Sequence, residues 1–247
     1  MAIPSDGHSF KAMLLAAGRG ERMRPLTDTM PKPLLQAGGR SLIEYHLDNL
    51  SAAGFREIVI NHAYLGKQIE ETLGSGERYG VAIQYSPEQI VLETAGGIAN
   101  ALPLLTDGSG NQPFLVVNAD IYCDIDFSLL LPRLQAMRSN PDNPRAHLLL
   151  VDNPAHHSEG DFALNADQVN LMGNNKLTFS GIGIYQSTLF ANVKPRAVMK
   201  LAPILRDVMQ DGRVSGEYFS GLWMDIGTPE RLDQLHQQLV TGRTGTT

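Results

Sequence analysis

The most constraining feature of this chain is a regular alternation of apolar, strand-like runs with amphipathic helical segments between residues 11 and 152. Strands are predicted where the apolar runs lie, at 11–17, 56–61, 81–85, 114–117 and 146–151. Helices are predicted between them, at about 41–54, 65–73, 96–102 and 127–137; the first opens with the capping box Ser41-Leu-Ile-Glu44. Since parallel strands are joined by helical crossovers, this order predicts an α/β fold with a mixed, mainly parallel central sheet covered on both faces.

The pattern changes after residue 152. Short segments at 162–164, 168–171 and 177–185 predict antiparallel strands, and helices are expected at about 197–209 and 229–239. Thr228 and Pro229 are the N-cap and first residue expected of the second helix. No linker separates the halves, so we expect one domain over residues 10–240, with halves 10–152 and 153–240, and flexible ends at 1–9 and 242–247.

Composition excludes several classes of protein. One cysteine, Cys123, rules out an intrachain disulfide framework, and a net charge of −6 disfavours nucleic-acid binding. The first residues lack the features of a secretory signal, and the apolar run at 12–17 is far shorter than the roughly 20 residues that a membrane helix needs. These features predict a cytoplasmic protein without a membrane partner, either a monomer or a small homo-oligomer. Cys123 is expected to be a buried apolar side chain.

The connection after the first strand carries the most informative motif. It reads Leu15-Ala-Ala-Gly-Arg-Gly-Glu-Arg-Met-Arg-Pro25, followed by Pro31-Lys32-Pro33. Glycines at this place allow the backbone N–H groups to bind a phosphate, and the two prolines hold Lys32 on a stiff turn. Met23 occupies the third glycine position of a dinucleotide fingerprint, and no Gly-Lys-Ser/Thr follows as in a Walker A loop. A solvated basic loop is the alternative interpretation.

This combination resembles the signature of the sugar-1-phosphate nucleotidyltransferases, over nearly the whole chain from about residue 11 to 239. Within that family, residues 20–27 and 59–63 are most similar to the N-acetylmuramate 1-phosphate uridylyltransferases of cell-wall recycling. The resemblance implies a Rossmann-like nucleotidyltransferase fold with a small sugar-binding lobe. Residues 10–152 would bind the nucleotide and 153–240 the sugar phosphate. The implied reaction transfers UMP from UTP to N-acetyl-α-muramate 1-phosphate and releases pyrophosphate.

The resemblance also implies the catalytic residues. Arg22 would bind the β- and γ-phosphates, and Lys32 would neutralise the α-phosphate and the acceptor phosphate. Asp120 follows a buried strand, where a carboxylate suits Mg²⁺, although Ala119 stands where the family usually has glycine. Asp225, in Trp-Met-Asp-Ile-Gly, would complete the Mg²⁺ site and also contact the sugar phosphate.

Further binding residues are implied for each substrate. The nucleotide would contact Gly18, Gly20, Glu21, Arg22, Lys32, Ala95, Gly96 and Asn118. Ala95 and Gly96 belong to the segment 86–97, whose small residues would leave room for backbone groups to bind the base; a helix start that requires close packing is the alternative interpretation. The sugar phosphate would contact Gly160 and Asp161.

Other side chains allow weaker predictions. Contact of Asn61 and His62 with the acceptor is left open, and Arg196 and Lys200 are candidates, by elimination, for the lactyl carboxylate of muramate. The adjacent His156 and His157 suggest a metal site, but neighbouring side chains diverge and no third ligand has suitable spacing.

Two other functions fit the sequence less well. The first is a different substrate pair, as in a mannose-1-phosphate guanylyltransferase or a hexose-1-phosphate uridylyl- or thymidylyltransferase. The second is a non-catalytic regulatory subunit that binds nucleotide sugars, which would be expected to have lost part of the charged set that this chain retains.

Overall fold

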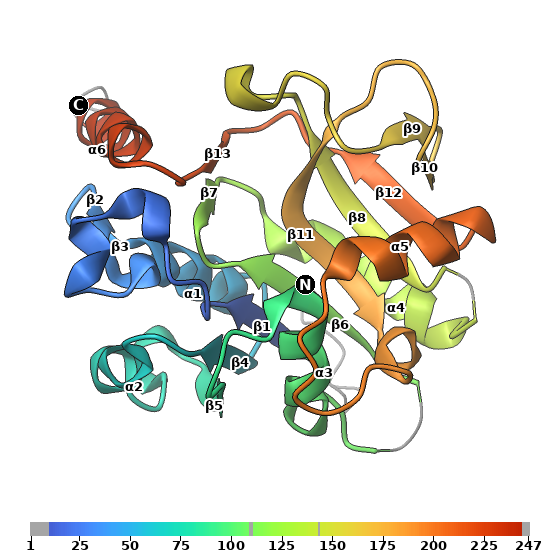
Figure 1. Ribbon diagram of the computed structural model, residues 1–247, viewed down its shortest axis with the longest axis horizontal. Helices are drawn as coiled ribbons and strands as arrows, with labels where there is room; N and C mark the ends of the chain where they lie inside the picture. Colours follow the sequence, from blue (N-terminus) through green and yellow to red (C-terminus); the bar gives the residue numbers. More distant parts are fainter. Residues whose placement is uncertain (1–9, 109–110, 143, 244–247) are drawn as a thin grey trace, which may run out of the picture.

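The computed structural model describes residues 10–108, 111–142 and 144–243. Its centre is a mixed sheet of nine strands in the order β5-β4-β1-β6-β11-β8-β12-β10-β9 (Figure 1). The bounds are β1 Ala12–Leu15, β4 Glu57–His62, β5 Ala82–Pro87, β6 Pro113–Asn118, β8 Ala146–Val151, β9 Ala163–Asn165, β10 Gln168–Asn170, β11 Thr178–Gln186 and β12 Val214–Tyr218. The predicted α/β class and the mixed, mainly parallel sheet are confirmed.

Strand direction divides this sheet into two parts. β5, β4, β1 and β6 run parallel, and β8 and β12 form a second parallel pair. β11 lies between the two groups and is antiparallel to both β6 and β8. The sheet therefore contains strands from both halves of the chain.

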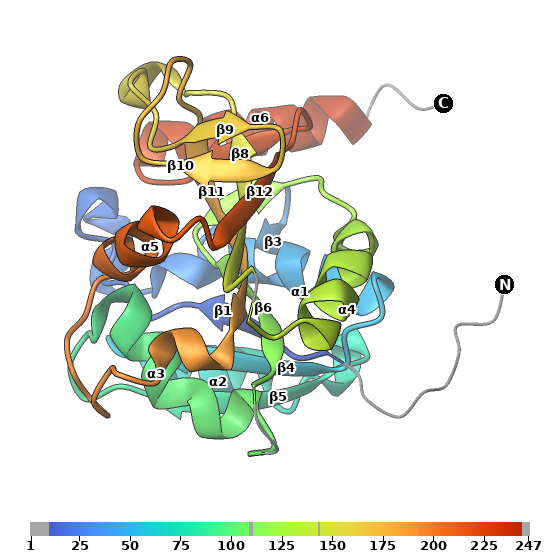
Figure 2. The same ribbon diagram turned by 90° about the vertical axis from the view of Figure 1, so that its right-hand side faces the viewer.

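Helices cover both faces of the sheet (Figure 2). Their bounds are α1 Leu42–Ala52, α2 Gly66–Leu73, α3 Glu93–Leu105, α4 Leu131–Ser139, α5 Leu201–Gln210 and α6 Pro229–Arg243. Alternate residues of each central strand belong to opposite cores, as in β1, where Ala12 and Leu14 pack with α1, α2 and α4 while Met13 packs with α3 and α5. This period of two explains why the central strands read as continuous apolar runs: both of their faces are buried.

A third, smaller core attaches the C-terminal helix. It contains Met23, Leu35, Leu42, Ile226 and Leu235, which join the connection after β1 to α6. Two short strand pairs border it: β2 (Gln36–Ala37) with β3 (Arg40–Ser41), and β7 (Ile121–Cys123) with β13 (Trp223–Asp225). Short 3-10 turns complete the chain: η1 Glu21–Met23, η2 Leu26–Asp28, η3 Lys32–Leu34, η4 Glu77–Tyr79, η5 Phe127–Leu130, η6 Ala155–His157 and η7 Ser187–Phe190.

Several details differ from the predictions. Sequence reasoning missed β12 and the short strands β2, β3, β7 and β13, whose few residues carry little periodicity. The helix expected at 127–137 begins as the 3-10 turn η5. The flexible end expected at 242–247 is wrong for its first two residues, because α6 extends to Arg243. Residues 1–9 and 244–247 lie outside the described part. Within the described residues, every helix is too short or too polar to cross a membrane.

The capping box at the start of α1 offers a test of the local folding signal. Ser41 and Glu44 form the reciprocal hydrogen bonds predicted from the sequence, with the Ser41 backbone N–H donating to Glu44 at 2.9 Å. We expect Ser41→Ala to lower the free energy of unfolding by about 1 kcal/mol, because it leaves a first-turn N–H without its acceptor. Urea denaturation measures this loss. The exposed Ser158 provides a control, and Ser158→Ala should change stability by less than about 0.5 kcal/mol.

Candidate active site

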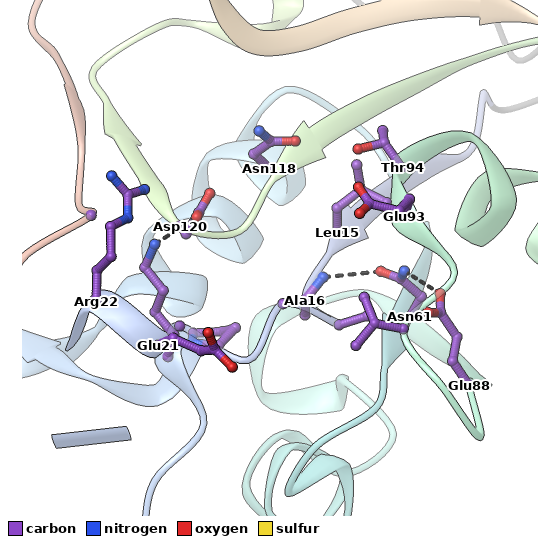
Figure 3. Close-up of a pocket in the computed structure, with 17 residues that line it drawn as sticks. Leu15, Ala16, Glu21, Arg22, Asn61, Glu88, Glu93, Thr94, Asn118 and Asp120 are labelled. Atoms are coloured by element: carbon purple, nitrogen blue, oxygen red, sulfur yellow. Dashed lines mark hydrogen bonds and ion pairs between the residues drawn. The ribbon is translucent and has the colours of Figure 1, made fainter. Parts of the chain in front are cut away.

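A cavity of about 440 Å³ opens at the carboxyl ends of the four adjacent parallel strands (Figure 3). Residues that follow these strands form most of its wall: 15–18 and 20–22 after β1, Asn61 in β4, Glu88 after β5, and Asn118 and Asp120 at the end of β6. Lys32, Pro33, Gly227 and the start of α3 complete it. Ligands of open α/β sheets bind at this edge, so we regard the cavity as the candidate active site.

The glycine-rich connection is shaped by contacts around Gly20. Its φ of +66° is costly for other residues, and a Cβ there would lie 3.1 Å from the Cβ of Lys32. The Gly20 carbonyl accepts hydrogen bonds from the Met23 N–H at 2.9 Å and from Thr27 Oγ1 at 2.9 Å. The N–H groups of Gly18, Arg19 and Gly20 have no acceptor in the described part of the chain. Such free backbone donors suit an anion.

The three arginines of this connection have different surroundings. Arg19 lies over the ring of Tyr64, 5.0 Å from its centroid, and Arg24 pairs with Asp28 at 2.6 Å. Arg22 lines the cavity and has no hydrogen-bond or ion-pair partner among the described residues. The structure therefore leaves Arg22 available for a ligand, as the resemblance implied.

Lys32 and Asp120 form an ion pair inside the cavity. Lys32 Nζ lies 2.6 Å from Asp120 Oδ2, although the residues are 88 positions apart in sequence. The Lys32 side chain is 8% exposed, because Pro31 and Pro33 hold it on the turn η3 against Gly20, whereas that of Asp120 is 44% exposed. A buried ammonium needs such a partner to remain charged. The cavity therefore contains a fixed positive charge beside the free N–H groups.

Asp225 reaches the same region from the C-terminal part of the chain. Strand β13 places it opposite Ile121, and the next residue, Ile226, donates its N–H to the Asp120 carbonyl at 2.9 Å. The Asp225 carboxylate is held by Arg231 Nη1 at 2.5 Å and by His156 Nε2 at 3.0 Å. Backbone pairing thus places Asp225 beside the segment that carries Asp120, although Asp225 itself is not among the residues of the cavity wall.

The other end of the cavity is closed by a hydrogen-bond network. Asn61 accepts from the Ala16 N–H at 2.9 Å and donates to Glu88 at 2.7 Å. The second oxygen of Glu88 accepts from the Leu92 N–H at 2.9 Å. Burial raises the pKa of Glu88, and the hydrogen bonds from Leu92 and Asn61 oppose this rise. The network links β1, β4 and the start of α3.

A family model described as "Nucleotidyl transferase" matches residues 11–160. The N-acetylmuramate alpha-1-phosphate uridylyltransferase of Neisseria meningitidis is 56% identical over 229 residues, covering 91% of this chain and 96% of that protein. The chain belongs to the nucleotidyl transferase family. The enzyme of the same name from Caulobacter vibrioides is 34% identical, covering 89% of this chain and 92% of its own.

The fold of this nucleotidyl transferase also matches a solved structure. A Bacillus anthracis protein proposed to be a glucose-1-phosphate thymidylyltransferase superposes with a TM-score of 0.79 at 21% identity. The match covers 94% of this chain and 95% of that one. At this identity the likeness shows the shared fold alone.

Not every residue expected at the site lines the cavity of this nucleotidyl transferase. Ala95 lies in the first turn of α3, and its side chain is fully buried in the core. The Gly96 N–H donates to the Met199 carbonyl at 3.1 Å, and a Cβ on Gly96 would collide with the Ala197 carbonyl oxygen. Glu93 and Thr94 line the cavity instead. The lack of a side chain at Gly96 thus permits close packing of the helix start, the alternative interpretation of this segment, and contact of Ala95 and Gly96 with the nucleotide stays a prediction.

Gly160 and Asp161 also lie away from the cavity wall. Asp161 accepts from the Phe179 N–H at 2.8 Å and from His157 Nε2 at 3.1 Å. Gly160 has a φ of +62°, and a Cβ there would lie 2.8 Å from the Lys176 carbonyl oxygen. Both residues hold together the loops of the second half, so a direct contact with the acceptor stays a prediction.

The remaining candidates are placed as follows. His156 and His157 bind different carboxylates, those of Asp225 and Asp161, as expected for side chains that diverge. Arg196 and Lys200 are absent from the cavity wall. Cys123 is buried, and burial raises its pKa to about 12, which confirms the prediction of an unreactive apolar side chain.

Sequence reasoning selected the segment 86–97 for the base but named Ala95 and Gly96 within it. It therefore missed the side chains of Glu88, Glu93 and Thr94, which line the cavity. Glu88 comes directly after β5, so the rule that identified Asp120 at the end of β6 could have found it. Glu93 and Thr94 begin α3, and their position on the wall depends on where the preceding loop turns.

Acid stability provides a test of the backbone support beneath Asp120. His46 of α1 is buried and hydrogen-bonds the Ile121 carbonyl through Nε2 at 2.8 Å. Burial lowers its pKa to about 4, from about 6.5 in an unfolded chain. The unfolded state therefore binds this proton first, and stability should fall as pH drops from about 6.5 towards 4. We expect His46→Gln to reduce this fall in urea denaturation series. An unchanged pH profile would contradict the assignment of a neutral His46.

Proposed function

We propose that this chain transfers UMP from UTP to N-acetyl-α-muramate 1-phosphate, giving UDP-N-acetylmuramate and pyrophosphate. The observation that carries the reaction class is the cavity itself, where free backbone donors, unpaired Arg22 and buried Lys32 face one space at the strand ends. The choice of substrates rests on the 56% identical relative of that name. The cytoplasmic location predicted from the sequence accords with these soluble substrates.

The reaction depends on neutralising the negative charge of the phosphates more than on proton transfer. A phosphate oxygen of the sugar 1-phosphate attacks the α-phosphorus of UTP, and the bond to the bridging oxygen of pyrophosphate breaks. The acceptor phosphate is already ionised near neutral pH, so no side chain has to remove a proton. Positioning and electrostatic stabilisation therefore dominate catalysis.

The chain's own residues divide this work. The N–H groups of Gly18, Arg19 and Gly20, with the Arg22 guanidinium, would bind the β- and γ-phosphates and stabilise charge on the leaving group. Lys32 would bind between the α-phosphate and the acceptor phosphate, where like charges approach. In this scheme residues 10–152 supply the nucleotide contacts and 153–240 the sugar-phosphate contacts.

The two aspartates fit a Mg²⁺ site by their chemistry. Asp120 and Asp225 are carboxylates on backbone segments that hydrogen-bond to each other, and Mg²⁺ prefers one or two carboxylates with phosphate oxygens and water. The described residues contain no cluster of three or more His, Cys, Asp or Glu side chains that could hold a metal ion. When bound there, Mg²⁺ would offset phosphate charge and align the two substrates.

The three arginines allow a matched test of the phosphate site. We expect Arg22→Ala to lower kcat/KM for UTP by about 10²–10³-fold, because it removes a preorganised positive charge. Arg19→Ala should stay within about threefold of wild type, because that side chain lies on Tyr64 at the surface. Pyrophosphate release measures both values. Equal losses in the two variants would contradict the role given to Arg22.

Lys32 and Asp225 are tested by the rate of the chemical step. Lys32→Ala and Asp225→Asn should each lower kcat by at least about 10²-fold while the circular dichroism spectrum stays native. Lys67→Ala, on exposed α2, is the control. Wild-type turnover in either site variant would remove the assignment.

A substrate panel completes the test of specificity. UTP, GTP and dTTP are offered with N-acetylmuramate 1-phosphate, N-acetylglucosamine 1-phosphate, glucose 1-phosphate and mannose 1-phosphate. The highest kcat/KM should belong to UTP with the muramate. A different best pair would favour one of the other transferases, and nucleotide binding without pyrophosphate release would favour the regulatory subunit.

A further inference from the structure

Glu93 has an unusual backbone conformation where α3 begins at the cavity. Its φ is +61°, in the left-handed region that side chains with a Cβ avoid. Asparagine, aspartate and glycine tolerate this region best, and glutamate has no such local advantage. Strained residues of this kind persist where the surrounding structure holds them, and they concentrate at functional sites.

The side chain of Glu93 points to a function for this strain. It is exposed on the cavity wall, across from Arg22 (Figure 3). Its carboxylate has no hydrogen-bond or ion-pair partner in the described part of the chain. By contrast, the carboxylate of nearby Glu88 is buried and fully engaged with Asn61 and Leu92.

The other strained positions do not share this placement. The remaining non-glycine residues with positive φ are Leu65, Ala166, Asn175 and Arg196. Each of them lies outside the wall of the nucleotide cavity. Among the described residues, Glu93 is thus the non-glycine residue with positive φ that lines this cavity.

Charge decides which part of a nucleotide this carboxylate can bind. An ionised carboxylate only accepts hydrogen bonds. The phosphates of UTP are negative and offer no donor at neutral pH. The cationic Arg22 lies away from Glu93, and so does Asp120, which holds the ammonium of Lys32 at 2.6 Å (Figure 3). The donors that remain on uridine are the base N3–H and the ribose hydroxyls.

We propose that Glu93 is a specificity-determining residue that accepts a hydrogen bond from the nucleoside of the bound nucleotide. The left-handed backbone at residue 93 directs the carboxylate into the cavity, and the network of Ala16, Asn61 and Glu88 holds the adjoining Leu92 in place. This inference rests on the proposed nucleotidyl transfer and names the residue that recognises the nucleoside.

A competing account is purely structural. An acidic side chain in the first turn stabilises a helix through the helix dipole, and Glu93 occupies that turn in α3. In that case removal of the carboxylate would change stability and leave nucleotide affinity unaltered. The two accounts therefore differ in a binding measurement.

The experiment compares wild type with Glu93→Gln and Glu93→Gly. The glutamine variant removes the charge and retains the strain, while the glycine variant removes both. We expect the Kd for UTP from calorimetry, and the KM, to rise about tenfold in each, with kcat within about threefold of wild type, which corresponds to loss of about one hydrogen bond to a charged group. The melting temperature of Glu93→Gly should be at or above that of wild type.

Ala166→Gly is the matched control for backbone strain. Ala166 has a φ of +53° in the exposed turn between β9 and β10, away from the cavity. This variant should alter melting temperature in the same direction as Glu93→Gly and leave Kd, KM and kcat unchanged. If Ala166→Gly raises Kd as much as Glu93→Gly does, the effect comes from stability and the proposal is overturned.

Three analogues identify the donor. N3-methyl-UTP lacks the base N–H, 2′-deoxy-UTP lacks the 2′-hydroxyl, and 3′-deoxy-UTP lacks the 3′-hydroxyl. The analogue without the relevant donor should bind wild type about tenfold more weakly than UTP does, whereas Glu93→Gly should bind that analogue and UTP equally. Penalties that are the same in wild type and Glu93→Gly for all three analogues would overturn the proposal.

The failure of this inference differs from the failure of the proposed function. If wild-type protein releases pyrophosphate from UTP but the Glu93 variants have unchanged Kd and KM, the proposed function stands and the inference about Glu93 is wrong. Wild-type protein that releases none with any pair in the panel would remove the proposed function, and the calorimetric comparison of Glu93 variants would still decide whether the residue binds the nucleoside.

Discussion

The ion pair between Lys32 and Asp120 is the contact on which the site depends. It joins the connection after β1 to the end of β6, and its ammonium is almost completely removed from solvent. Asp120 holds the ammonium in place before any substrate arrives, so the two groups do not have to be brought together during the reaction. The same carboxylate repels an incoming phosphate, which makes the position suitable for a divalent cation. Arg22, which lines the same cavity, has no partner among the residues that the structure describes.

The two ends of the cavity differ in how their polar groups are used. At the end formed by the glycine-rich connection, the N–H groups of Gly18, Arg19 and Gly20 and the Arg22 guanidinium have no acceptor within residues 10–108, 111–142 and 144–243. At the opposite end, Asn61 and Glu88 satisfy each other and two backbone donors, and both side chains are buried. Open donors suit a variable, hydrated polyanion, whereas a satisfied network fixes the shape of a wall. This difference is why the unpartnered Glu93 carboxylate stands out at the fixed end.

The sequence predicted those helices and strands that are marked by a pattern within the element itself. Buried strands carry long apolar runs, and the rule that ligands bind at the carboxyl edge placed Lys32 and Asp120 together before any distance was known. The insertion of β11 between β6 and β8 depends on pairing across the chain, which no local pattern records. The same limitation affected Gly96 and Asp161, whose short-range motifs suggested ligand contact. Their hydrogen bonds go to Met199 and Phe179, partners far away in sequence.

The C-terminal helix α6 helps to hold Asp225 in position. Arg231, near the start of α6, and His156, from the second half, both hold the carboxylate of Asp225. The helix is itself attached to the glycine-rich connection through the small core that contains Met23 and Leu235. Since β13 pairs with β7 directly after Asp120, movement of α6 would shift both aspartates with respect to Lys32. Residues of the second half therefore hold Asp225 beside a cavity whose wall, apart from Gly227, comes from the first half.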